Sequence, residues 1–160
     1  MNQRNIPVGV SDFSEIRQND YYYVDKSELI RELLKTSIAK VTHITRPRRY
    51  GKTLAMSMLA NFFDIRQKNE SLFQGLAVSS DSSLCKEWMN QWPVVFLSLK
   101  NIDGLTFSTA YQQLAYEIGL LFKKHKYLLT DEKIGPAEKE LFERLKNRSA
   151  SEVEVSFCSL

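Results

Sequence analysis

The sequence predicts an α/β domain in which helices flank a parallel sheet. Residues 41–45 and 94–99 are two short apolar runs, and segments with helical periodicity lie before and after each of them. An almost continuous apolar run is typical of a strand that is covered on both faces, as the strands of parallel sheets are. Strands that alternate with helices along the chain favour a parallel sheet.

The composition limits the class of protein. The 160 residues are 43% hydrophobic and 26% charged, as in a globular protein that is soluble in water. The net charge of +3 is too small, by itself, to indicate a nucleic-acid partner. The N-terminus lacks the apolar core of a signal peptide, and no stretch approaches the roughly 18 apolar residues that a membrane helix needs. We therefore expect a cytoplasmic protein that does not associate with a membrane.

The N-terminal part contains few signals of regular structure. Residues 1–20 are predicted to be irregular, and residues 21–24 form a short β-prone run. Asp25 and Ser27 are candidate caps for the helix that follows. The next apolar run ends before Pro47, because proline cannot donate a hydrogen bond to a sheet ladder.

Four later segments have helical signals. Leu54, Met58 and Phe62 recur at helical spacing, which makes the first of these helices amphipathic. Pro136 suits the first turn of the last helix, where its missing N–H is not needed. The predicted helices are residues 52–66, 86–91, 106–124 and 136–148.

The segment that points to a chemical function lies between the first apolar run and the helix at residues 52–66. Gly51, Lys52 and Thr53 open this helix, whose free N–H groups and dipole favour a polyphosphate. Lys52 is the candidate catalytic residue, with its ammonium near the β- and γ-phosphates, and the Thr53 hydroxyl is the candidate Mg²⁺ ligand. The candidate nucleotide-binding residues are Arg48, Arg49, Tyr50, Gly51, Lys52, Thr53 and Leu54.

The loop before this helix departs from the common pattern of phosphate-binding loops. The pattern G-x-x-x-x-G-K-[ST] has a glycine where this chain has Arg46. Arg46, Arg48 and Arg49 also place three guanidinium groups close together. One of them can brace a phosphate or an acidic neighbour, the group can bind a nucleic-acid backbone, or the loop can simply be solvated. The residues leave these three interpretations open.

An ATPase also needs an acidic residue at the end of an apolar strand, where it holds the Mg²⁺ water shell. The run at residues 94–99 is followed by Lys100 and Asn101, and Asp103 is too far from its end. Either the acidic strand follows Leu160, or the domain binds nucleotide without hydrolysing it.

Several ordered motifs resemble the bacterial AAA-ATPase-like family. The resemblance is clearest in Thr-Arg-Pro-Arg-Arg-Tyr-Gly-Lys-Thr-Leu at residues 45–54, and Arg46 belongs to the usual form of the loop in that family. A serine at position 27 replaces the threonine of the family and keeps the hydroxyl. The motifs lie at residues 6–13, 22–30, 45–54, 73–76 and 92–100.

The resemblance implies a P-loop NTPase-type fold with ATP and Mg²⁺ as cofactors. Residues 1–38 would be a lead-in segment, and residues 39–160 would be the P-loop core, ending before the acidic Walker B strand. Members of the family commonly contain a nuclease-related domain of the PD-(D/E)XK type, which would follow in the full-length chain. Hydrolysis of ATP is then expected of the full-length protein, and residues 1–160 alone are expected to be inactive.

A few other residues allow two interpretations. The tyrosines at residues 21–23 can stack on an adenine ring, although half-buried packing is more common for tyrosine. Asp25 and Lys26 can lie near the nucleotide, although Asp25 is also a good helix cap. His43 fits a hydrogen-bonded core position better than a catalytic one.

Overall fold

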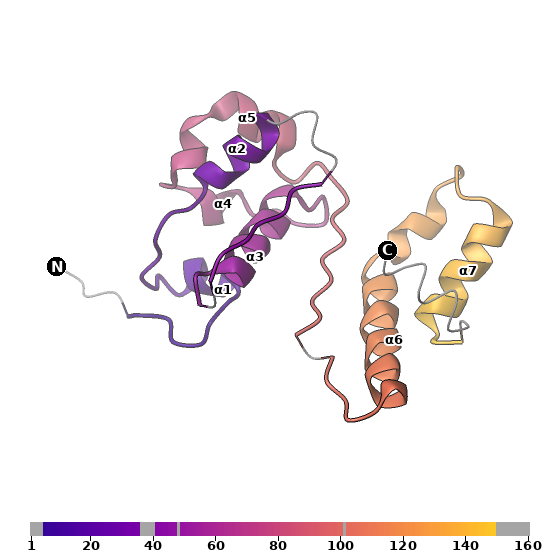
Figure 1. Ribbon diagram of the computed structural model, residues 1–160. Coiled ribbons are helices and arrows are strands. Elements are labelled where there is room, and N and C mark those ends of the chain that lie inside the picture. Colours follow the sequence, from indigo (N-terminus) through magenta and orange to yellow (C-terminus); the bar gives the residue numbers. More distant parts are fainter. Residues whose placement is uncertain (1–4, 36–40, 48, 101, 150–160) are drawn as a thin grey trace. The chain divides into compact units, whose positions relative to one another are not determined.

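The computed structural model describes residues 5–35, 41–47, 49–100 and 102–149 of the 160-residue chain. The chain divides into two compact units between Val94 and Val95 (Figure 1). The boundary predicted between residues 38 and 39 lies outside the described residues and stays a prediction.

The described part of the first unit consists of helical segments around one apolar core. Phe13, Phe62 and Phe73 are fully buried, with ring centroids 5.0 Å apart for Phe13 and Phe73 and 5.2 Å apart for Phe62 and Phe73. Ile30 and Met58 are fully buried as well. Burial of each such side chain stabilises the fold by about 1.5–3 kcal/mol. The segments are α1 (Phe13–Gln18), α2 (Glu28–Lys35), α3 (Lys52–Phe63), α4 (Glu70–Phe73), η1 (Ala77–Ser80) and α5 (Ser82–Trp88).

Helix α1 corrects the prediction that residues 1–20 are irregular. Asp12 caps it, because its carboxylate accepts hydrogen bonds from the backbone N–H groups of Ser14 at 2.7 Å and Glu15 at 3.2 Å. Phe13 donates its N–H to the buried Ser57 hydroxyl on α3 at 3.0 Å. The Arg17 guanidinium also donates to the Leu72 carbonyl at 2.7 Å. These bonds attach α1 to α3 and to α4.

Asp25 and Ser27 precede α2 but use their side chains elsewhere. The Asp25 carboxylate accepts from the Ser27 N–H at 2.8 Å and from the Ala77 N–H at 2.7 Å. The Ser27 hydroxyl, which is fully buried, accepts from the Val78 N–H at 3.0 Å. The predicted caps of α2 therefore fasten this segment to η1, about 50 residues further along the chain.

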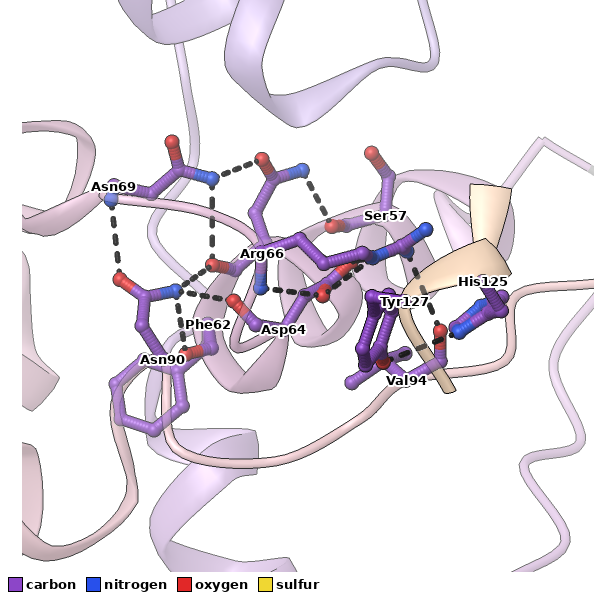
Figure 2. Close-up of polar contacts among 10 residues, drawn as sticks. Ser57, Phe62, Asp64, Arg66, Asn69, Asn90, Val94, His125 and Tyr127 are labelled. Atoms are coloured by element: carbon purple, nitrogen blue, oxygen red, sulfur yellow. Dashed lines mark hydrogen bonds and ion pairs between the residues drawn. The ribbon is translucent and has the colours of Figure 1, made fainter. Parts of the chain in front are cut away.

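Helix α3 ends at Phe63, three residues before the predicted end, because a polar network occupies its last turn (Figure 2). The Asn90 side-chain amide donates to the carbonyls of Asn61 at 3.1 Å and Asp64 at 3.1 Å, and it also reaches the Phe62 carbonyl at 3.4 Å. The Asn90 backbone N–H donates to the Phe62 carbonyl at 2.7 Å. Asp64 is buried and forms an ion pair with Arg66, whose Nε donates to Oδ1 at 2.9 Å.

Helix α5 begins earlier than the predicted helix at residues 86–91. Asp81 caps it by accepting from the Leu84 N–H at 3.1 Å. Residues 79–83, which are rich in Ser and Asp, thus include the start of a helix, since these residue types favour helix caps as well as loops.

The second unit contains a helical hairpin, and here the two predicted helices are confirmed, with the second ending two residues before its predicted end. Helices α6 (Phe107–Lys124) and α7 (Pro136–Lys146) are connected through η2 (Lys126–Thr130) (Figure 1). They pack through the buried residues Ile118 and Leu145. The side chain of Thr106 caps α6, and Pro136 occupies the first turn of α7. No helix within the described ranges has the length and apolar character needed to cross a membrane.

The predicted parallel sheet is wrong for the described residues, which contain helices and irregular chain but no strand. Asp64 and Trp92 form one isolated parallel bridge, and it extends no further within the described ranges. The apolar runs at residues 41–45 and 94–99 are not hydrogen-bonded to neighbouring strands there. Val41 is 84% exposed and Val95 is 67% exposed. An apolar run shows a tendency toward burial, but a strand also needs a partner that supplies its hydrogen bonds.

Candidate functional site

Helix α3 begins directly after a glycine. Gly51 precedes the helix with φ 79° and ψ 25°, in the left-handed region that favours glycine. It provides no side-chain cap, and the first turn of α3 contains no acidic residue. The first N–H groups of a helix have no partner within the helix itself, and they concentrate the positive end of its dipole. The start of α3 is therefore suited to an anion that is not part of the helix.

The Lys52 side chain folds back onto the loop that precedes the helix. Its ammonium donates to the carbonyl of Arg46 and, at 3.3 Å, to the carbonyl of Pro47. Lys52 is exposed. The positive charge predicted to contact phosphates is thus held beside the loop by neutral acceptors.

A second lysine contacts the same loop. The Lys26 ammonium donates to the Tyr50 carbonyl at 3.0 Å and lies 5.6 Å from the centroid of the Tyr50 ring. The Arg46 guanidinium lies 6.0 Å from the same ring. A Cβ atom on Gly51 would lie 3.2 Å from the Lys26 ammonium. Glycine at this position therefore permits the left-handed backbone and also the close approach of a cation.

The predicted nucleotide-binding residues that the structure describes are gathered around one hollow. A cavity of about 470 Å³ is lined by Gly9, Val10 and Ser11 on one side. Arg48 lies outside the described residues, so its predicted role stays a prediction. The rest of the lining comes from Arg49, Tyr50, Gly51, Lys52, Thr53 and Leu54.

Two further cavities lie beside the loop, and both include Tyr50 and Gly51 in their walls. One, of about 430 Å³, is largely apolar and includes Ile6 and Tyr22. The other, of about 330 Å³, has the more polar walls of the two, includes Lys52, and is called the polar cavity below. The two cavities beside the loop thus differ in the polarity of their walls.

The polar cavity contains two carboxylates that the sequence analysis did not single out. Glu28 and Glu32, four residues apart on α2, line it together with Lys26 and Lys52. Glu28 forms an ion pair with Arg31. Residues four apart on a helix lie on the same face, so the sequence could have suggested that these two carboxylates point the same way.

Magnesium fits the loop only as part of a nucleotide complex. Thr53 is exposed in the wall of the largest of the three cavities. Within the described ranges, no group of three or more His, Cys, Asp or Glu residues could hold a metal ion. Mg²⁺ commonly keeps several waters and takes its remaining ligands from phosphates. The residues present therefore suit Mg²⁺ that arrives bound to a polyphosphate.

The structure places Tyr22, Tyr23 and His43 in different surroundings, and each can be compared with its predicted role. Tyr23 packs edge-on against Phe13, with ring centroids 5.4 Å apart, and its hydroxyl lies 3.3 Å from the Met58 sulfur. Burial raises the pKa of Tyr23 above its usual value. Tyr22 is 56% exposed and lines the apolar cavity. His43 is exposed, so its assignment to the core was wrong.

Helix α3 follows a glycine that offers no side-chain cap, and the ammonium groups of Lys26 and Lys52 both contact the loop before it. This loop–helix junction has the chemistry that suits an anion. The sequence matches the family described as "Predicted AAA-ATPase" over residues 7–156, and the chain belongs to this family.

One curated relative has a similar sequence. The chain is 37% identical over 101 residues to the "Uncharacterized protein in vnfD 5'region" of Azotobacter chroococcum mcd 1. These residues are 61% of this chain but only 17% of that protein. The match thus spans less than a fifth of the relative's length. No solved structure matches this chain.

Proposed function

We propose that this chain binds Mg·ATP at the start of α3, as the nucleotide-binding part of a larger ATPase. The observation that supports this most directly is the uncapped helix start at Gly51, with Lys52 beside it. Membership of a family of predicted AAA-ATPases supports ATP as the ligand of this helix start.

The start of α3 would bind the phosphates through backbone N–H groups and the Lys52 ammonium. Lys52 donates to two backbone carbonyls, which are neutral acceptors. Phosphate oxygens are charged, and hydrogen bonds to charged groups contribute about 1.5–3 kcal/mol each. A polyphosphate would therefore compete well for this ammonium. Thr53 would provide one ligand to the Mg²⁺ that accompanies the nucleotide.

The apolar cavity beside the loop is suited to the base. Its walls include Ile6, Val10 and the exposed ring of Tyr22, and they continue into Tyr50 and Gly51. Aromatic and aliphatic side chains next to a phosphate site favour a flat heteroaromatic ring. We propose that the adenine of ATP lies in this cavity, with Tyr22 as its aromatic contact.

The remaining parts of the function concern the whole protein. We propose that hydrolysis uses an acidic residue that follows Leu160 in the full-length chain, and that a nuclease-related domain is the partner of this domain. A cytoplasmic location is also part of the proposal. The nucleic-acid interpretation of Arg46, Arg48 and Arg49 stays a prediction. The salt dependence of binding distinguishes it from nucleotide binding, since binding to a nucleic-acid backbone weakens steeply as the salt concentration rises.

The test compares two lysines. Binding of a fluorescent ATP analogue with Mg²⁺ is measured for the unchanged chain, for Lys52→Ala and for Lys68→Ala. Lys68 is an exposed lysine of the same unit that lines none of the cavities described above. We expect Lys52→Ala to weaken binding by about 10- to 150-fold, the equivalent of one charge-assisted contact. Equal affinity in the two variants would contradict the proposal, provided that circular dichroism shows both to be folded.

A further inference from the structure

We propose that Lys26 is a second phosphate-binding cation of the nucleotide site, and that the segment at residues 25–27 positions it there. This inference rests on the proposed function. It adds a binding residue from a segment that is 24 residues away from the loop in sequence.

The position of Lys26 supports a direct contact with the ligand. Its ammonium donates to the carbonyl of Tyr50, the residue before the helix cap. It also lies 3.2 Å from the position that a Cβ of Gly51 would occupy. The charge is therefore placed beside the residue that starts α3, where the free N–H groups of the helix begin.

The residues on both sides of Lys26 are fixed, although Lys26 itself is exposed. Asp25 accepts hydrogen bonds from the N–H groups of Ala77 at 2.7 Å and Ser27 at 2.8 Å. The Ser27 hydroxyl is fully buried and accepts from the Val78 N–H at 3.0 Å. A lysine that only keeps a surface soluble needs no such anchoring. The anchors hold the Lys26 backbone while its side chain reaches the loop.

The contacts that Lys26 makes are weaker than those a phosphate would offer. Its partners are one neutral carbonyl and the face of one ring at 5.6 Å. Charge-assisted hydrogen bonds to phosphate oxygens are roughly twice as strong as neutral ones. An incoming polyphosphate would thus replace the Tyr50 carbonyl as the acceptor.

The charges around the polar cavity also favour an anion. Lys26, Lys52 and Arg46 all line it. Two carboxylates face these cations, and that of Glu28 is already paired with Arg31. Lys26 contacts the Tyr50 carbonyl and Lys52 contacts the Pro47 carbonyl, so the two ammonium groups lie at different places on the loop.

A purely structural role would use Lys26 as a hydrogen-bond donor that holds the Tyr50 carbonyl. Three substitutions separate this role from phosphate binding. Lys26→Met removes the donor and the charge, Lys26→Gln keeps a donor without the charge, and Lys26→Arg keeps both. Lys68→Met is the matched control on an exposed lysine outside the cavities described above. Affinities for Mg·ATP and for adenosine are measured by calorimetry, with thermal unfolding of each variant.

We expect Lys26→Met and Lys26→Gln to bind Mg·ATP about tenfold more weakly, while Lys26→Arg stays within about threefold of the unchanged chain. Lys26 also lines the apolar cavity. Adenosine affinity should nevertheless fall much less than Mg·ATP affinity in Lys26→Met and Lys26→Gln, because the charge that these variants lose would contact the phosphates. The unfolding temperature should change little in all three, because the Tyr50 contact is exposed. If Lys26→Gln binds Mg·ATP as the unchanged chain does, or loses adenosine affinity equally, the inference is wrong. Lys52→Ala separates the two proposals. If it weakens binding and Lys26→Gln does not, only the role of Lys26 fails, whereas unchanged binding in both contradicts the proposed function as well.

Discussion

The two ends of α3 are built in opposite ways. At its start, Gly51 gives no side-chain cap, and Lys52 and Thr53 are exposed. At its end, the amide of Asn90 reaches the last carbonyls, and the buried Asp64 is paired with Arg66 (Figure 2). Polar groups at helix ends are normally satisfied by side chains or by water. One end of α3 is satisfied within the protein, and the other is left to solvent or a ligand.

This difference assigns separate tasks to the two ends. The network around Asn90 fixes the end of α3, because Asn90 lies 26 to 29 positions further along the chain than the three carbonyls to which its side chain donates. The start of α3 can then remain without a cap at little cost to the fold. We therefore expect substitutions at the end of α3 to change stability, and substitutions at its start to change mainly the affinity for nucleotide.

The largest effect is expected at Asn90. Asn90→Ala leaves the carbonyls of Asn61 and Asp64 without this donor, and it places alanine at a φ of 56°, which asparagine and glycine tolerate best. Loss of these bonds should lower the free energy of unfolding by about 2–3 kcal/mol. Urea titration followed by circular dichroism measures this change.

Asn90→Gly serves as the control, since it keeps the backbone freedom and removes only the side-chain amide. It should be destabilised less than Asn90→Ala. Both variants should bind Mg·ATP normally at temperatures where they are folded. A large loss of affinity in folded Asn90→Gly would mean that the two ends of α3 are not separable.

The next largest effect is expected at Gly51. Gly51→Ala places a Cβ in the left-handed region at φ 79°, which costs about 1–2 kcal/mol for a residue other than glycine. The new methyl group would also approach the Lys26 ammonium. Stability should therefore fall, and Mg·ATP affinity should fall as well, unlike the result at Asn90. Gly75→Ala is the matched control, because it has the same backbone strain at φ 77° and open space around its Cβ.

These two positions also show what the sequence could predict. Gly51, Lys52 and the apolar residues Leu54, Met58 and Phe62 lie close together in the chain. Their pattern therefore predicted the start of α3 correctly and placed its end three residues too late. Asn90 gave no such signal, because its partners are distant in sequence. Lys26 could be suggested only as a neighbour of the nucleotide, and the fold gives its actual contact.

The predicted sheet was wrong for the same reason that Asn90 gave no signal, namely that the interaction involves residues distant in sequence. The run at residues 94–99 has the composition of a buried strand, yet Val95 and Leu99 are 67% and 61% exposed. Composition reports how strongly a segment favours burial, whereas pairing depends on a second segment that the run itself does not specify. Helices need no such partner for their hydrogen bonds, which is why α6 and α7 were predicted well.

A smaller effect is expected at Thr53, and it concerns the metal alone. Thr53→Ala removes the hydroxyl proposed to bind Mg²⁺ in the first turn of α3. Affinity for ATP in the presence of Mg²⁺ should fall by about tenfold, at the lower end of the usual cost of losing a metal-site partner. Affinity measured in EDTA should match that of the unchanged chain. Thr42→Ala, at another exposed threonine, should show neither effect.

The smallest effect is expected at Asp25, which anchors the segment of Lys26. Burial raises the pKa of Asp25, but hydrogen bonds from the Ala77 and Ser27 N–H groups and from the Ser27 hydroxyl outweigh it, and the pKa lies below the usual 3.8. A carboxylate whose pKa is lower in the folded state stabilises the fold above its unfolded pKa, and this contribution disappears as the pH falls through the folded value. Asp25→Asn should therefore unfold at a lower temperature than the unchanged chain at pH 7. Because the carboxylate is exposed, the difference should stay below about 1 kcal/mol. The gap should close as the pH is lowered toward 3 and below, and a gap that widens in acid would show that the charge of Asp25 does not hold this segment against η1.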